Sequence, residues 1–137
     1  MNRSTVDTAA GILSGIKLNR IQNKTVKTTL LNDYIRLRKF AKETADSVKD
    51  VSDKFYEDWG KEKTEVEKLV RERKAVTGYD EYLKAEKDAE AIINDILSEE
   101  VDVQIIGVSF DDFITAVSDE ELSLEQVAFL QEIGIVQ

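Results

Sequence analysis

Residues 25–59 read TVKTTLLNDYIRLRKFAKETADSVKDVSDKFYEDW, and the spacing of their apolar side chains decides the fold. Apolar residues recur in alternating steps of four and three, which is typical of a helix that packs one narrow face against another helix. This spacing predicts one helix from about Thr25 to Trp59, about 50 Å long. Thr44 is the one polar member of this first seam, which consists of Leu30, Tyr34, Leu37, Ala41, Thr44, Val48, Val51 and Phe55.

A second seam of the same kind predicts an antiparallel partner for the long helix. Thr77 and Gly78 are typical of a helix stop, and two helices joined by a short break lie antiparallel. Gly60 is a point at which the long helix can kink or break, and a helical pattern resumes from Lys61 to Ala75. The second seam, in a helix from Tyr79 to Ser98, consists of Tyr82, Ala85, Ala89, Ile92 and Ile96. The sequence therefore predicts a helical hairpin that is coiled-coil-like at its charged tip.

The segments on either side of the hairpin predict a small sheet. Val101, Val103 and Ile105 alternate with polar residues, which is typical of a strand. An isolated strand leaves its backbone groups unpaired, and the best partner in this chain is the segment 16–19, with Lys17 facing Asp102.

Three short helices complete the expected fold. One runs from about Thr5 to Ser14 with Ser4 as its N-cap, and two C-terminal helices run over 110–117 and 124–133. The predicted class is mainly α with a small β element (α+β): a long antiparallel helical hairpin, a short two-stranded sheet and two short C-terminal helices. We expect a single domain, 1–137, in which a tip at about 56–86 projects from a base formed by 1–50 and 88–137.

Composition excludes several kinds of chemistry. The 137 residues contain no cysteine and no histidine, which removes disulfides, thiolate metal sites and the commonest general base. The six glycines form no phosphate-binding loop, and the acidic residues lack the spacing of a calcium loop. No apolar run has the length of a membrane span or a signal peptide. We therefore expect a soluble intracellular or particle-associated protein that is not an enzyme and holds no metal or cofactor.

The charges of this chain are concentrated in two regions of opposite sign. Residues 88–137 contain thirteen acidic residues and no lysine or arginine, whereas residues 17–42 contain eight basic residues and the single acid Asp33. On a helical wheel some of the basic residues form a stripe beside the first seam. Such a stripe can bind a polyanion, or the acidic C-terminal segment can fold back onto it. The basic stripe consists of Arg20, Lys24, Lys27, Arg38 and Lys42.

Two further groups are candidate partner-binding residues. The acidic residues Asp111, Asp112, Glu120 and Glu121 can bind a basic protein or imitate a nucleic-acid backbone, although acids near helix N-termini also stabilise the helix dipole. Tyr56 and Trp59 lie beside Phe55 near Gly60, where they are either core residues or an interaction hot spot.

The C-terminal third resembles the ending of small uncharacterised proteins of tailed bacteriophages and prophages. The resemblance rests on Glu99-Glu100-Val101-Asp102-Val103, Ile105 and Leu122-Ser123-Leu124-Glu125, with Ile16-Lys17-Leu18 near the start of the chain. The chain departs from that pattern at Leu124, where a proline is common, and in a shorter connection around Gly78. No catalytic residue lies in the shared motif, so the resemblance implies a viral or mobile-element origin in a bacterium.

The leading hypothesis is a non-enzymatic interaction module that binds a host or phage protein, located in the bacterial cytoplasm or in the virion. The alternative is a virion structural or assembly component, such as a scaffold, connector or packaged protein, that acts through self-association as a homo-oligomer. A third hypothesis is an acidic inhibitor that mimics DNA. The net charge of −9 disfavours binding to nucleic acid.

Overall fold

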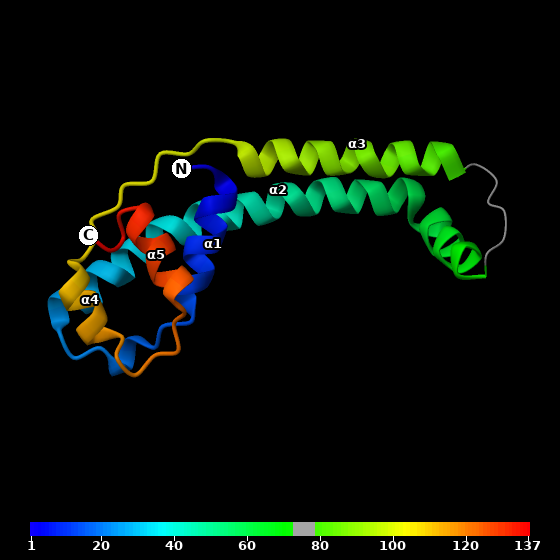
Figure 1. The fold of residues 1–137 in the computed structure, drawn as a ribbon. Helices are drawn as coiled ribbons and strands as arrows, with labels where there is room; N and C mark the ends of the chain where they lie inside the picture. The colour runs from blue at the N-terminus through cyan, green and yellow to red at the C-terminus, as the bar shows by residue number, and fades with distance from the viewer. Residues whose placement is uncertain (73–78) are drawn as a thin grey trace. The chain divides into compact units, whose positions relative to one another are not determined.

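The structure, a computed structural model, describes residues 1–72 and 79–137. The chain is 76% helical and 3% strand, and the described residues contain no sheet. The fold is therefore mainly α, and the predicted two-stranded sheet is wrong. The helix stop expected at Thr77 and Gly78 lies outside the described residues. In chain order, the helical elements are α1 (Arg3–Ser14), the 3₁₀ helix η1 (Leu18–Arg20), α2 (Lys24–Arg71), α3 (Tyr79–Ser98), α4 (Phe110–Ala116) and α5 (Leu124–Glu132) (Figure 1).

The chain divides into two compact units, and α2 runs through both of them. The terminal unit consists of Met1–Glu43 and Glu99–Gln137, and the hairpin unit consists of Thr44–Ser98. That the whole chain folds as one domain stays a prediction.

The terminal unit contains the main hydrophobic core. One face of α1, formed by Val6, Ala9, Ala10 and Leu13, is buried, and Leu37 of α2 is fully inaccessible to solvent. The cap of α1 differs from the expectation: Asn2, rather than Ser4, accepts a hydrogen bond of 2.8 Å from the backbone N–H of Thr5. Ser4 is the second residue of α1, so it lies past the N-cap position. Other fully buried residues of this core are Val6, Phe113, Leu130, Ile135 and Val136.

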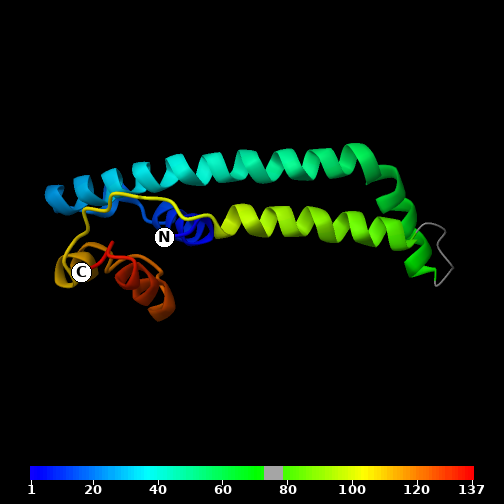
Figure 2. The same cartoon turned by 90° about the horizontal axis from the view of Figure 1, so that it is seen from above.

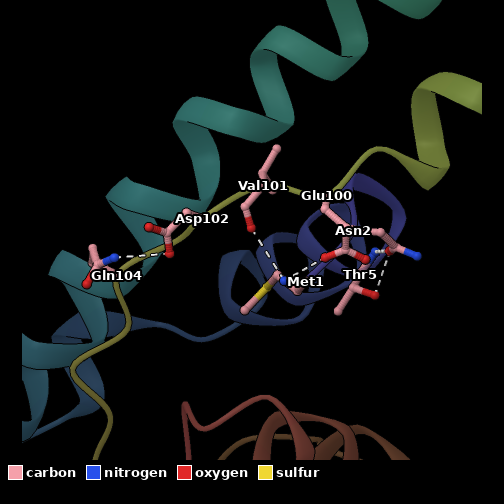
Figure 3. Close-up of polar contacts among 7 residues, drawn as sticks. All are labelled: Met1, Asn2, Thr5, Glu100, Val101, Asp102 and Gln104. Atoms are coloured by element: carbon pink, nitrogen blue, oxygen red, sulfur yellow. Dashed lines mark hydrogen bonds and ion pairs between the residues drawn. The ribbon is translucent and has the colours of Figure 1, made fainter.

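The segment 101–106 is extended, and its side chains alternate between half-buried and exposed. The expected strand is wrong, because this segment pairs into no sheet, and its expected partner is wrong as well, because Leu18–Arg20 forms the 3₁₀ helix η1 instead. The N-terminal residues take the place of that partner. The backbone N–H of Val101 donates to the carbonyl of Met1 at 2.9 Å, and that of Arg3 donates to Glu99 at 3.0 Å. Figure 3 shows Met1 and Asn2 beside Glu100 and Val101.

Side chains of α2 form hydrogen bonds with backbone groups in the rest of this extended segment. The Asp33 carboxylate accepts hydrogen bonds from the backbone N–H groups of Ile106, at 2.8 Å, and Gly107, at 2.9 Å. The Arg36 guanidinium donates to the carbonyl of Gln104 at 2.8 Å. Because side chains provide these hydrogen bonds, the segment stays extended without a neighbouring strand.

The two short C-terminal helices lie close to where the sequence places them. Ser109 caps α4 by accepting from the N–H of Asp112 at 3.2 Å. Ser123 and Gln126 form a capping box at the start of α5. After α5 the chain returns to Val108, whose N–H donates to the carbonyl of Ile135 at 2.9 Å.

In the hairpin unit, α3 lies alongside α2, whose last turns bend out of line with the rest of the helix, as Figures 1 and 2 both show. The predicted helical hairpin is confirmed. Gly60 lies inside a continuous helix, so it does not end α2. Thr44, the polar member of the first seam, is only 1% exposed.

Candidate interaction surfaces

An aromatic cluster lies where the two helices of the hairpin unit meet. Tyr82 of α3 is 4% exposed, and the centroid of its ring lies 6.0 Å from that of Phe55 and 6.2 Å from that of Trp59. The Tyr82 hydroxyl donates to Glu86 at 2.9 Å. Burial of the ring, assisted by this hydrogen bond, raises the pKa of Tyr82 to about 12. Trp59 therefore contributes to the contact between the helices. This is what is expected of a core residue of the hairpin unit.

Tyr56 lies at the edge of the same cluster and is 55% exposed. Its ring packs edge-on against Phe55 at 6.1 Å between centroids, and the Lys63 ammonium lies 5.6 Å from the Tyr56 centroid. These contacts hold the phenol ring in place while leaving half of it open to solvent. Tyr56, more than Trp59, has the exposure that an interaction residue requires.

Several grooves of the hairpin unit lie along the line where α2 and α3 meet, and two of them contain Phe55. One is lined by apolar side chains that include Phe55, Trp59 and Ile92, with Lys54 and Asp88 among its charged residues. The other includes Ser52, Tyr56 and Ile93. Two helices can bury only the residues that face each other, so both grooves expose apolar surface.

The basic stripe lies on the terminal unit, and the structure separates Arg20 from its other members. Arg20 belongs to η1, whereas α2 begins at Lys24, after Asn23 caps it by accepting hydrogen bonds from the N–H groups of Thr25 and Val26. Within the described part of the chain, no stripe residue forms an ion pair. Leu31 and Ile35 share the helix face of Lys24, Lys27, Arg38 and Lys42, and they are 37% and 55% exposed. We call this set the basic face.

A small apolar pocket adjoins the basic face. It has a volume of 130 Å³ and is lined by residues of α1, the following loop, η1 and α2. Leu31 belongs to both the pocket and the basic face. The lining residues are Leu13, Ser14, Ile16, Leu18, Leu30, Leu31 and Tyr34.

The acidic residues proposed from the sequence are only partly brought together. Asp111 and Asp112 lie in the first turn of α4, where they stabilise the helix dipole. Glu120 and Glu121 line a polar groove with Lys17 and Arg20. The Glu120 carboxylate accepts a hydrogen bond of 3.1 Å from the backbone N–H of Lys17, so the acidic and basic regions do meet in this unit. The contact uses the Lys17 backbone rather than the charge of the stripe.

The sequence interpretation missed Asp33 and Leu124. Asp33 is fully buried as the hydrogen-bond acceptor described above, and its position as the lone acid in a basic stretch was the available signal. Leu124 is the first residue of α5 and is 91% exposed. Its place directly after a capping serine indicates an exposed first turn, but from the sequence it was noted only as a departure from the phage pattern and was assigned no role.

Comparison with known proteins finds no matching family model, no matching curated protein and no matching solved structure. None of the described helices combines the length and the apolar character needed to cross a membrane. Over residues 1–72 and 79–137, no three carboxylates gather as metal ligands would.

Proposed function

We propose that this protein is a non-enzymatic interaction module that binds a helix of another protein through its hairpin unit. One observation carries this proposal: the hairpin unit has very little core of its own. Among its described residues only Thr44, Val66 and Tyr82 are buried, whereas Tyr56, Val70 and Ile92 are each at least half exposed.

A third helix laid along a groove would bury this apolar surface. Ile92 and Trp59 line the groove that also contains Ala85 and Ala89, and small residues on α3 let another helix approach closely. Burying one exposed aliphatic side chain of this kind contributes about 1.5–3 kcal/mol. The charged residues at the edges of the groove would select the partner.

The resemblance to small phage and prophage proteins suggests the source of that partner. It would be a bacterial host protein or a second phage protein, encountered in the host cytoplasm or in the virion.

Site-specific crosslinking tests the proposal. A photoreactive phenylalanine analogue at Ile92, in the groove, should capture one protein in stoichiometric amount from bacterial lysate. The same analogue at Glu62, an exposed position of α2, should not capture it. With the captured protein purified, calorimetry should show that Ile92→Asp weakens binding on the order of tenfold or more, and that Glu62→Gln has little effect. Failure to recover any stoichiometric partner at Ile92 would argue strongly against an interaction module.

A second candidate function is self-association as a structural or assembly component of a virion. The groove that contains Ile92 has Lys54 on α2 and Asp88 on α3, so it carries both signs of charge. A surface of that kind can pair with itself across a two-fold axis. Light scattering distinguishes this candidate: a homodimer that Ile92→Asp returns to a monomer would favour self-association through the hairpin unit.

A further inference from the structure

Leu124 is an apolar side chain of the terminal unit that is exposed to solvent. Its exposed fraction of 91% is the highest among the large apolar residues described as exposed. The capping box holds the first turn of α5 in place, with Ser123 N–H donating to Gln126 at 2.9 Å and Gln126 N–H donating to Ser123 at 3.1 Å. Glu121 and Glu125, both exposed, flank Leu124 in the sequence. The chain therefore presents an exposed leucine with an acidic residue on either side of it in the sequence.

The apolar pocket beside the basic face has complementary properties. Its volume of 130 Å³ suits one aliphatic side chain, since a cavity of about 150 Å³ holds a benzene molecule. Along α2, Lys27 lies one turn before Leu31 of the pocket wall, and Arg38 lies one turn after Tyr34. In the described part of the chain, neither cation forms an ion pair with a carboxylate. The pocket is therefore an apolar opening flanked by unneutralised positive charge.

We propose that the terminal unit binds a second copy of this chain, whose Leu124 enters the pocket while its Glu121 and Glu125 face Lys27 and Arg38. Leu124 is nearly fully exposed within its own copy, so it does not fill the pocket of the same chain. Complementary charge and complementary shape both favour this occupant over an unrelated one.

Such a contact joins two different surfaces, so each copy keeps one free Leu124 and one free pocket. Contacts of this kind produce rings when they close and open chains when they do not. The two surfaces belong to the terminal unit, so this inference does not rest on partner binding by the hairpin unit.

Sedimentation velocity of the full chain over micromolar concentrations tests the inference. The wild-type protein should show a weight-average mass above that of the monomer, which falls as salt is raised because the flanking charges become screened. Leu124→Glu should sediment as a monomer, and so should the double variant Lys27→Glu/Arg38→Glu. All three substitutions are at solvent-accessible side chains, and circular dichroism should confirm that each variant is folded.

A mixing experiment makes the test specific. Leu124→Glu keeps its pocket, and Lys27→Glu/Arg38→Glu keeps its leucine. Mixed in equal amounts, the two monomeric variants should form a heterodimer and nothing larger, since the remaining surface on each copy is disabled. Ile92→Asp serves as the control, because a change in the hairpin unit should leave the wild-type assembly intact.

Three outcomes would overturn the proposal. In one, the wild-type chain stays monomeric throughout the concentration range. In another, the chain associates, but Ile92→Asp abolishes association and Leu124→Glu does not, which assigns self-association to the hairpin unit. In the third, the chain associates only when a single-stranded oligonucleotide is added, and Lys27→Glu/Arg38→Glu abolishes that association while Leu124→Glu does not, which assigns the basic face to nucleic acid.

Discussion

The Asp33 carboxylate accepts a hydrogen bond of 2.9 Å from the backbone N–H of Gly107, although 74 positions of sequence separate the two residues. Its second oxygen accepts from Ile106 at 2.8 Å, and the whole side chain is inaccessible to solvent. One acid in a basic stretch thus holds the extended segment that leads from α3 to α4.

Asp33→Ala should therefore destabilise the protein by about 3 kcal/mol, because two backbone N–H groups lose their charged acceptor in a partly buried site. Asp102→Ala is the matched control: it removes the same charge from an exposed side chain and should change the free energy of unfolding by less than about 0.5 kcal/mol. Urea denaturation measures both. Equal free energies of unfolding for the two variants would mean that the hydrogen bonds of Asp33 do not stabilise the extended segment.

Gly107→Ala should be destabilising by about 1–3 kcal/mol. Gly107 has a φ of +81°, and an added Cβ would collide with the carbonyl of Gly134 and the side chain of Gln137. Gly11, in the middle of α1, has open space at the same position. Gly11→Ala should thus stabilise the protein by about 0.5–1 kcal/mol, and thermal unfolding should show shifts of opposite sign for the two variants.

Tyr82 should titrate with a pKa of about 12, above its ordinary value of 10.0. Because the folded state favours the neutral phenol, Tyr82 contributes stability that is fully present below pH 10 and is lost as the pH rises from about 10 to about 12. Ultraviolet absorbance of tyrosinate should show a late phase near pH 12 that is missing from Tyr82→Phe. If the late phase persists in that variant, it belongs to another tyrosine.

Phe113→Ala tests whether the chain unfolds as one domain. Phe113 is fully buried in the terminal unit, and its truncation should cost about 3–5 kcal/mol. Trp59, the single tryptophan, reports on the hairpin unit. Since α2 is continuous through both units, we expect Trp59 fluorescence and far-ultraviolet circular dichroism to shift together. A Trp59 transition unchanged from the wild type would instead show that the hairpin unit unfolds independently.

The parts of the fold that depend on local spacing could be predicted from the sequence. The seams from Leu30 to Phe55 and from Tyr82 to Ile96 predict the hairpin because each residue's neighbours on a helix face are three or four positions away. The capping residues Ser109 and Ser123 mark helix starts for the same local reason. The N-cap of α1 was misplaced because two polar residues, Asn2 and Ser4, compete for that position.

The parts that depend on distant pairing could not be predicted. Alternation at Val101, Val103 and Ile105 shows that the segment is extended, but it does not identify what binds the backbone. A carboxylate can replace a strand as acceptor, and nothing in the spacing around Asp33 distinguishes that role. Prediction of the candidate site from the sequence had the same limit. A helical wheel places Lys27 and Arg38 on one face of α2, but only the fold shows that Leu31, on that same face, lines a pocket.

Arg3 gives the fold a particular order of assembly. Its guanidinium lies 3.8 Å from the Glu43 carboxylate and 3.4 Å from that of Glu99, the two residues at which the chain leaves and re-enters the terminal unit. If residues 44–98 were unfolded, bringing Glu43 and Glu99 together would cost the entropy of closing a long loop. The hairpin, by contrast, forms from contacts between residues that are close in sequence. We therefore expect α3 to gain amide protection in pulsed hydrogen exchange before Val101 and Val108 do. The hairpin would then act as a folding template, and the docking of the chain's first residues would be the step that completes the native state.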